Sequence, residues 1–390
     1  MLISIPLKQH VGSLNQPIVE VGDVVERGEL LAIPTKLGAN IFSSFSGEVA
    51  EVNENYIVIN CSSDQDFDHF VPLKDKKTPL EMVEEAGIVG AGGAGFPTAI
   101  KLKNQIPDGV FIANAVECEA LLCHNMEEID EEVELLIKGI HYCMDITKAP
   151  RAVIAIKEKH AKEIALLNEA LKEETQIELF LLPNLYPAGD ERVLVREIKG
   201  VTLQPGQLPI EAGVIVDNIE TIKRVAEAID FKKPFIDKDV TVAGRVKDGT
   251  TVLRNVPIGT PVGELIQAAG GYEHPHGEIV IGGPMTGQTG NEQSPVTKTT
   301  GGVLVAMPFP QTKKKMGLLV CECGGSEDRM RHIAEEMGTT VVAVERCKRM
   351  VEVNGRYRCS LPGVCPGQAE AVLSLRKKGA ESLMVGTCSN

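Results

Sequence analysis

Residues 1–75 alternate between apolar and polar positions in short runs. Representative runs lie at residues 21–25, 28–32 and 46–52, and glycine stands at the turns beside them. A period of two is typical of half-buried β-strands, and glycine gives the backbone the freedom that tight turns need. This region therefore predicts a small all-β module.

From about residue 79 the pattern changes to helical periods that alternate with short apolar runs. The apolar runs lie at residues 110–113, 152–156, 177–182 and 214–216, and the helical patterns at residues 79–86, 125–141, 158–172, 190–199 and 219–229. Strands that alternate with helices predict a largely parallel sheet in an α/β layer. Ligands of such sheets bind beyond the carboxyl ends of the strands, so we expect site residues in the loops that follow them.

Two further segments complete the predicted organisation. Residues 239–285 combine strand-like runs with one helix at 261–269, which fits a compact α+β domain. After a basic linker, the alternation returns, with strands at 317–320, 340–344 and 382–385 and helices near 326–337 and 367–378. We therefore predict a multidomain α/β and α+β chain with four domains, at residues 1–75, 76–235, 236–310 and 311–390.

Composition and charge narrow the class of function. The chain has 390 residues, of which 43% are hydrophobic and 24% charged, as in soluble globular proteins. No apolar run reaches the roughly 18 residues of a membrane span, and no signal peptide is visible. A net charge of −14 and 4% aromatic residues disfavour nucleic acid as a partner. We expect a cytoplasmic protein, either free or peripheral at a membrane, without direct membrane insertion.

The densest glycine motif is residues 90–98, GAGGAGFPT. Glycine lets the backbone approach a ligand closely, and Pro97 suits the first turn of a helix that runs through Lys101. Amides at such a helix start and the Lys101 ammonium form a candidate phosphate site. A purely structural turn explains the glycines equally well. The order of the glycines matches neither the Rossmann fingerprint nor a phosphate loop.

Polar loops follow other predicted strands of the same layer. Residues 114–119 (NAVECE) and 217–218 (DN) come directly after strands, and residues 186–192 (YPAGDER) open a helix. Amide and carboxylate groups at strand ends suit a heterocycle or a ribityl chain that carries many hydroxyl and imide groups. Taken one at a time, each loop is also explained as a helix cap or a turn.

Together, these motifs resemble the RnfC-type electron-transport subunits, which are relatives of the NADH-oxidising flavoprotein subunit of respiratory complex I. The motifs that carry the resemblance, in order along the chain, are residues 90–101 (GAGGAGFPTAIK), 114–119, 186–192, 217–221 (DNIET) and 282–287 (GGPMTG). The resemblance implies a lipoyl-like barrel-sandwich module, an FMN- and NADH-binding α/β domain and a soluble-ligand-binding β-grasp (SLBB) domain. Lys36 lies where lipoyl carriers bear their modified lysine, but its neighbours lack the carrier motif, which favours a structural module.

The resemblance also implies which residues hold the cofactors. The residues implied to bind the phosphate side of FMN are Gly90, Gly92, Gly93, Gly95 and Lys101. Those implied to surround its ribityl chain and ring are Asn114, Glu117, Gly189, Asp190, Glu191 and Asn218. Glu119 and Glu191 are the candidates for contact with the nicotinamide nucleotide. The chain departs from the family pattern at Val116, Ala120 and Asp190.

Six of the ten cysteines crowd the C-terminal end of the chain. RnfC proteins carry two four-cysteine runs for [4Fe-4S] clusters after the β-grasp domain, and neither run is present here. Instead Cys321, Cys323, Cys347 and Cys388 each follow a predicted strand closely. If the strands are parallel, these thiols converge at one sheet edge and serve as redox-active thiols.

Metal ligation is the other interpretation of the same cysteines. The candidate ligands of zinc or an iron–sulfur cluster are Cys321, Cys323, Cys347, Cys359 and Cys365, of which the last two lie in the loop expected to fold over that edge. Reduced cysteines that only fill space remain a third interpretation.

The cysteine-rich end is similar to that of the proline reductase-associated electron-transfer proteins, a family of RnfC-like proteins. This similarity implies that electrons pass from NADH through FMN to the C-terminal thiols or metal centre, and then to a partner reductase such as D-proline reductase. Members carry selenocysteine near the end, so we expect the natural reading frame to continue through a selenocysteine codon after Asn390. The alternatives are the RnfC component of a membrane Rnf-type complex and a scaffold that has lost its flavin.

Overall fold

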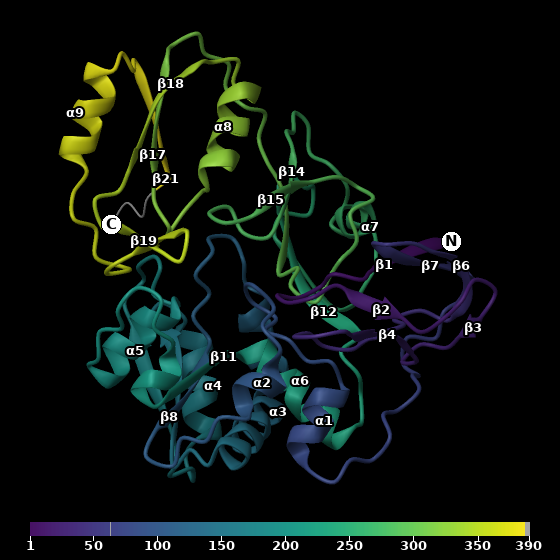
Figure 1. Cartoon of the computed structure of the whole chain (residues 1–390). Helices are drawn as coiled ribbons and strands as arrows, with labels where there is room; N and C mark the ends of the chain where they lie inside the picture. The colour runs from purple at the N-terminus through teal and green to yellow at the C-terminus, as the bar shows by residue number, and fades with distance from the viewer. Residues whose placement is uncertain (63, 387–390) are drawn as a thin grey trace.

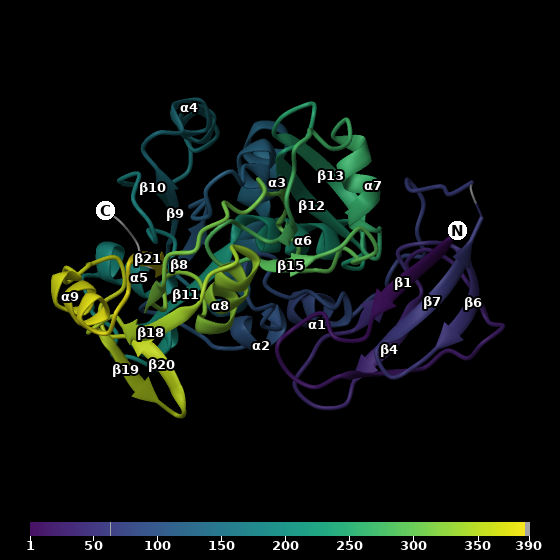
Figure 2. The same ribbon diagram turned by 90° about the horizontal axis from the view of Figure 1, so that it is seen from above.

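The computed structural model describes residues 1–62 and 64–386 of the chain. The N-terminal and C-terminal segments lie on opposite sides of the molecule (Figures 1 and 2). Cys388 lies outside the described residues. Among the helices of the described residues, none has the length and apolar character needed to cross a membrane.

The N-terminal segment is a module of two small antiparallel sheets. The first sheet has the order β1 (Leu2–Pro6), β7 (Tyr56–Cys61), β6 (Gly47–Val52) and β3 (Val24–Val25), and the second joins β2 (Asn15–Pro17), β4 (Leu30–Pro34) and β5 (Ile41–Phe42). Alternate side chains of β1 and β7 point into one apolar core, as the period of two predicted. Lys36 is exposed in the connection between β4 and β5.

The middle segment contains a four-stranded, fully parallel sheet. Its order is β10 (Ile177–Leu182), β9 (Ala152–Lys157), β8 (Val110–Asn114) and β11 (Val214–Asn218). The helices of this segment are α1 (Pro79–Glu85), α2 (Thr98–Leu102), α3 (His124–Thr147), α4 (Ala161–Ala170), α5 (Glu191–Lys199) and α6 (Ile219–Asp230), with a 3-10 turn at Pro209–Ala212. The predicted α/β layer is therefore present, and all its strands run in the same direction.

Helix α3 is longer than the expected helix at residues 125–141. It continues to Thr147 because Cys143, Met144 and Thr147 extend its buried face. Helix α2, by contrast, is short: it contains only one turn and ends at Leu102. Lys101 of the predicted site therefore lies at the end of this single turn and not along an extended helix.

The third segment is a five-stranded mixed sheet of order β13 (Thr251–Pro257), β12 (Asp237–Gly244), β16 (Gly302–Val305), β14 (Ile279–Ile281) and β15 (Gln288–Gly290). Its one helix, α7 (Val262–Ala268), packs against the sheet through Val262, Leu265 and Ile266. This arrangement is the compact α+β unit that the pattern predicted.

The C-terminal segment contains the parallel sheet β18 (Val341–Arg346), β17 (Met316–Val320) and β21 (Ser382–Gly386), with helices α8 (Glu327–Glu336) and α9 (Ala369–Lys377). The prediction of parallel strands is confirmed. A hairpin of β19 (Met350–Val353) and β20 (Arg356–Cys359) was not predicted. Its turn is Asn354-Gly355, where both residues have positive φ, and this dipeptide was the missed signal.

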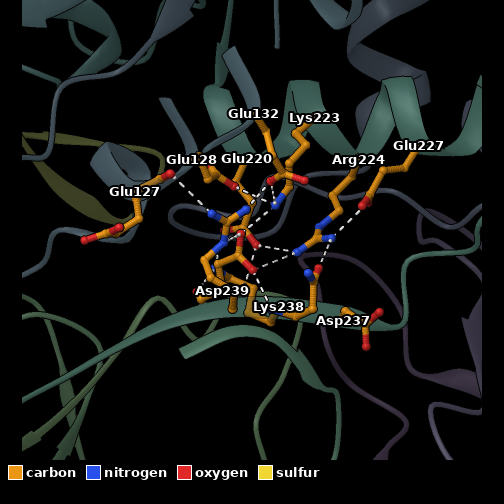
Figure 3. Close-up of polar contacts among 12 residues, drawn as sticks. Glu127, Glu128, Glu132, Glu220, Lys223, Arg224, Glu227, Asp237, Lys238 and Asp239 are labelled. Atoms are coloured by element: carbon orange, nitrogen blue, oxygen red, sulfur yellow. Dashed lines mark hydrogen bonds and ion pairs between the residues drawn. The ribbon is translucent and has the colours of Figure 1, made fainter. Parts of the chain in front are cut away.

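A buried network of charged side chains joins the α/β layer to the mixed sheet (Figure 3). Glu220 of α6 pairs with Lys238 of β12, and the neighbouring Asp239 contacts Lys223 Nζ at 2.5 Å and Arg224 Nη2 at 3.4 Å. All five side chains are buried. Buried charges are tolerated when they are paired and hydrogen-bonded, so this network fixes the two sheets relative to each other.

The same network contains three carboxylates close enough to hold a cation, those of Glu128, Glu220 and Asp239. The Lys223 ammonium lies between them, 3.2 Å from Glu128 Oε1, and supplies the positive charge. Burial raises the pKa of Glu128 well above its usual range, although Lys223 opposes this shift. The cluster is therefore an ion-pair joint rather than a metal site.

Candidate functional site

A cavity of about 930 Å³ opens between the carboxyl edge of the parallel sheet and the mixed sheet. All the predicted cofactor residues line it: Gly90, Gly92, Gly93, Gly95, Lys101, Asn114, Glu117, Glu119, Gly189, Asp190, Glu191 and Asn218. They come from four separate loops. One loop follows β8, one follows β11, one precedes α5, and the fourth is the glycine loop before α2. The topology thus brings the motifs together, as expected for a parallel sheet.

The glycine loop forms one wall of this cavity. The loop is closed by a hydrogen bond from the Gly90 amide to the Phe96 carbonyl (3.0 Å). Within the described residues, the five backbone amides of residues 92–96 donate to no hydrogen-bond acceptor. At Gly93, whose φ is +118°, a Cβ would meet no atom within 4 Å. The wall therefore offers unpaired donors and open space, which fits an anionic group such as the phosphate of FMN.

The unpaired amides belong to the glycine loop, at residues 92–96. The Thr98 amide at the start of α2 already donates to the Ile88 carbonyl (3.0 Å). Binding of the phosphate by amides at the start of α2 was expected from the sequence; the first of these amides is engaged, and phosphate binding at this helix start stays a prediction.

Lys101 lies in the wall below the loop. Its ammonium donates to the Val216 carbonyl (2.6 Å) and pairs with Asp217 Oδ1 (3.0 Å) and Glu191 Oε1 (3.3 Å). Burial alone would lower the pKa of Lys101, but the charges of the two carboxylates raise it above its ordinary value. Burial raises the pKa of Asp217, although the charge of Lys101 opposes this shift. Contact of Lys101 with a phosphate stays a prediction.

The loops of residues 114–119 and 186–192 hold one another in place. Asn114 Nδ2 donates to the Gly189 carbonyl (3.1 Å), and the Gly189 amide donates to Cys118 Sγ (2.8 Å). A Cβ at Gly189 would lie 2.8 Å from that sulfur, so only glycine fits. Burial raises the pKa of Cys118 to about 11, so this thiol stays protonated. Asp190 caps α5 by accepting from the Arg192 amide (2.8 Å).

Glu119 closes one side of the cavity. Its carboxylate accepts hydrogen bonds from the amides of Met285 (2.8 Å) and Thr286 (3.0 Å) in the GGPMTG loop of the mixed sheet. No contact was predicted for that loop from the sequence. Glu119 was expected to meet the nicotinamide nucleotide, whereas both its oxygens here hold the loop.

Other residues that line the cavity were not predicted from any sequence motif. Lys8 and Tyr56 of the N-terminal module reach the same cavity, and the Val11 amide donates to the Ala94 carbonyl of the glycine loop (3.1 Å). Contacts of this kind join segments far apart in the chain, and no local pattern announces them.

A second group of residues gathers at the carboxyl edge of the C-terminal sheet. Cys321, Cys323, Cys347, Cys359 and Cys365 line one small pocket. The predicted convergence is thus observed for the described cysteines, including the two that were placed in the covering loop. Hydrogen bonding with the Cys323 side chain is the main cause that lowers the pKa of Cys321, to about 6, and the pKa of Cys359, to about 7, whereas burial raises the pKa of Cys347.

One segment connects the two sites. Gly189, Asp190 and Glu191 line the cavity, while Tyr186 donates to the Cys323 carbonyl and Arg192 Nη1 donates to the Cys359 carbonyl (3.0 Å). The cysteine cluster therefore packs directly behind one wall of the cavity.

Comparison with known proteins agrees with this geometry. Residues 83–227 match the Nuo51 FMN-binding domain, and residues 2–65 match the RnfC barrel sandwich hybrid domain. These matches confirm the predicted FMN-binding domain and N-terminal module. In fold, the chain is similar to the crystal structure of NAD+-reducing [NiFe]-hydrogenase in the H2-reduced state, with a TM-score of 0.50 and 22% identity over 59% of this chain and 46% of that one.

Curated relatives match over different shares of their length. The chain is 38% identical to the cobalamin reductase PduS of Citrobacter freundii, over 60% of this chain and 51% of that protein, and thus spans about half of it. It is 31% identical to a component of the proton-translocating ferredoxin:NAD(+) oxidoreductase complex of Clostridium ljungdahlii, over 77% of this chain and 70% of that protein. A similar match, 30% identity over 72% of the protein, is found with the corresponding component of the Na(+)-translocating complex of Acetobacterium woodii. By sequence, the chain belongs to the RnfC family of electron-transport proteins.

Proposed function

We propose that the chain oxidises NADH with FMN held in the large cavity, and that electrons leave through the C-terminal cysteine cluster toward a partner reductase. The observation that carries this proposal is the meeting of all the predicted cofactor residues in one cavity of about 930 Å³. Sites that bind cofactors are typically of this size and combine apolar walls with a few convergent polar groups.

The roles of the residues follow from their positions. The free amides of the glycine loop bind the phosphate, and Gly93 leaves the room that its approach needs. Asn114 and Asn218 line the cavity, and their side-chain amides suit the hydroxyls of a ribityl chain. Asn114 Nδ2 also donates to the Gly189 carbonyl, and Asn218 Oδ1 accepts from the Glu220 amide, so both side chains are held in place. Bound FMN would supply the acceptor for a hydride, and the protein supplies binding, orientation and electrostatics.

Glu119 and Glu191 are the proposed contacts of the nicotinamide nucleotide. Glu191 is half-exposed and pairs with Lys101, while Glu119 holds the loop of residues 283–287 over the cavity. Binding of the nucleotide by Glu119 therefore requires the carboxylate to exchange the amides of that loop for hydroxyls of the ligand. The carboxylate oxygens suit both sets of donors.

The electron acceptor is proposed to be a separate reductase, with D-proline reductase as the specific candidate. The support is the similarity of the cysteine-rich end to proteins associated with that enzyme. A second candidate is a role as the RnfC component of a membrane Rnf-type complex, which the identity with two such components favours. The lack of four-cysteine runs among residues 311–390 favours the first candidate.

Anaerobic mixing tests the proposal. The purified full chain, reconstituted with FMN, should lose its visible flavin absorption when NADH is added at millimolar concentration. Retention of the absorption with both NADH and NADPH would contradict the dehydrogenase role and favour the scaffold. A matched sample without FMN controls for absorption by the cysteine cluster.

A further inference from the structure

One buried side-chain amide in the wall of the large cavity has no partner. It belongs to Asn125, the second residue of α3, which lines the cavity and is only 3% exposed. Its side-chain oxygen is buried and accepts no hydrogen bond from the described residues, and its side-chain nitrogen has no acceptor among them. Both the acceptor and the donors of this amide are therefore free.

A free amide of this kind is unfavourable in a protein interior. Native structures leave few buried polar atoms without a hydrogen-bond partner, because an unpaired group loses its bonds to water and gains none in return. Leucine has nearly the same shape as asparagine and avoids this penalty at a buried position. An unpaired amide in a cavity wall therefore points to a partner that enters the cavity.

The other asparagines that line the cavity are engaged with the protein. Asn114 donates to the Gly189 carbonyl at 3.1 Å and accepts from the Val116 amide at 3.0 Å. Asn218 accepts from the Glu220 amide at 2.9 Å. The free amide differs from both because no described protein group holds it.

The backbone that carries the free amide is held firmly. The backbone amide of Asn125 donates to Glu117 Oε2 (3.3 Å), and the Lys157 ammonium donates to the Glu117 carbonyl (2.8 Å). The backbone amide of His124 donates to Thr241 Oγ1 of β12 (3.1 Å). The start of α3 is thus tied to both sheets that enclose the cavity. A side chain on such a support is preorganised for a ligand, because little conformational freedom is left to lose on binding.

We propose that Asn125 recognises a planar ligand edge on which a hydrogen-bond donor and an acceptor stand side by side. Its Oδ1 accepts from the donor of this edge, and its Nδ2 donates to the acceptor, as asparagine does when it pairs with adenine. Such edges occur in the imide ring of a flavin and in the carboxamide and adenine of a nicotinamide dinucleotide. Asn125 is thus a specificity-determining residue of the cavity, and this role rests on the proposed function.

Binding by the full chain tests the proposal, with FMN and NAD+ as probes. FMN is titrated into the flavin-free protein and followed by flavin fluorescence, and NAD+ is titrated into the FMN-loaded protein and followed by calorimetry. Asn125→Leu should raise one of the two dissociation constants at least tenfold. A change for FMN identifies the flavin edge, and a change for NAD+ alone identifies the dinucleotide. Unchanged constants for both overturn the proposal. Asn168→Leu, at an exposed asparagine of α4, is the control and should change neither.

The stability of the flavin-free chain separates this role from a structural one. Because the Asn125 amide has no protein partner, Asn125→Leu should leave the midpoint of denaturant unfolding unchanged or raise it. Asn15→Leu is the matched control. Asn15 is similarly buried, at 2% exposed, but its amide bonds His10 Nε2 (2.9 Å) and the Ala39 carbonyl (2.8 Å), so this variant should lower the midpoint. A lower midpoint in Asn125→Leu would place its partner within the protein and overturn the proposal.

Failure of the proposed function gives a different result from failure of this inference. If NADH does not reduce the bound flavin, yet Asn125→Leu weakens the binding of either probe, the proposed function is refuted and the inference stands. If NADH reduces the flavin and neither dissociation constant changes, the inference is refuted and the proposed function stands. A wild-type chain that binds neither probe refutes both.

Discussion

The α/β layer meets two of its neighbours, the mixed sheet and the C-terminal segment, through interfaces that differ in burial. Toward the mixed sheet, Glu220, Lys238 and Asp239 are fully buried and paired (Figure 3). Toward the C-terminal segment, Arg192 pairs with Glu322 at 3.0 Å and Arg196 donates to the Pro362 carbonyl at 2.8 Å, and these side chains are only partly buried. The first, which we call the dense interface, is held by fully buried ion pairs, and the second, which we call the thin interface, is held by partly exposed polar contacts.

The difference teaches how the two sites are held. Breaking a buried ion pair leaves an uncompensated charge and typically costs about 3–5 kcal/mol, whereas partly exposed pairs contribute at most about 1 kcal/mol. The large cavity lies at the dense interface, so its walls are fixed. The cysteine cluster is positioned by the thin interface, so its distance from the cavity is set by weak contacts that can be altered without unfolding the protein.

The largest expected effect comes from the dense interface. Lys238→Met leaves Glu220 buried with Arg224 as its remaining cationic partner, and we expect the free energy of unfolding to fall by about 3 kcal/mol. Denaturant unfolding measures the change. Lys247→Met, at an exposed lysine beyond the same strand, is the matched control. A loss of less than about 1 kcal/mol in Lys238→Met would show that the buried network does not stabilise this joint.

Lys298 tests the same kind of interface through pH. Its ammonium donates to the carbonyls of Asn40 (2.6 Å) and Gly87 (2.7 Å), and burial lowers its pKa to about 7. Between pH 7 and its ordinary pKa near 10.5, the unfolded chain binds a proton there that the folded chain does not, so stability should rise with pH across this window. The rise, on the order of a few kcal/mol, should be flattened in Lys298→Met. Equal slopes of unfolding free energy against pH in both proteins would refute this assignment.

The cavity is tested by a substitution that adds bulk to the glycine loop. Gly93→Val places a side chain in the open space of the wall, and we expect FMN to bind at least tenfold more weakly, or about 1.4 kcal/mol. Flavin content after gel filtration measures the loss. Gly249→Val is the control, because Gly249 also has positive φ and no atom within 4 Å of an added Cβ. Stoichiometric flavin in the Gly93 variant would place the phosphate elsewhere.

The smallest expected effect comes from the thin interface. Arg192→Ala removes the contacts with Glu322 and the Cys359 carbonyl, and we expect the free energy of unfolding to fall by no more than about 1 kcal/mol. Hydrogen exchange in the hairpin of β19 and β20 should nevertheless speed up, since that hairpin loses an anchor. Arg151→Ala, which breaks an exposed pair with Glu178, is the control. Unchanged exchange in the hairpin would mean that other contacts position the cysteine cluster.

Much of the fold follows from local patterns. The strand at residues 177–182 and the parallel C-terminal sheet were predicted because apolar runs and helical periods alternate there without interruption. The hairpin of β19 and β20 was missed because charged residues such as Glu352 and Arg358 mask its alternation. The site residues were predicted from their motifs, but the partners of Lys101 and Glu119 were not. Those partners lie between 90 and 167 residues away along the chain, and only the folded chain brings them close.

The hydrogen bonds of Glu119 to Met285 and Thr286 join positions 166 and 167 residues apart in the chain. Gly283 in that loop has no room for a Cβ, which would lie 2.3 Å from the Glu119 carboxylate. Evolution therefore constrains the loop of Glu119 and the loop of Gly283 together. If the mixed sheet were exchanged for that of a distant relative, this wall of the cavity would be kept only where the new loop has a glycine at the position of Gly283, facing the Glu119 carboxylate. Among family members, we expect substitutions at positions 119 and 283 to occur together.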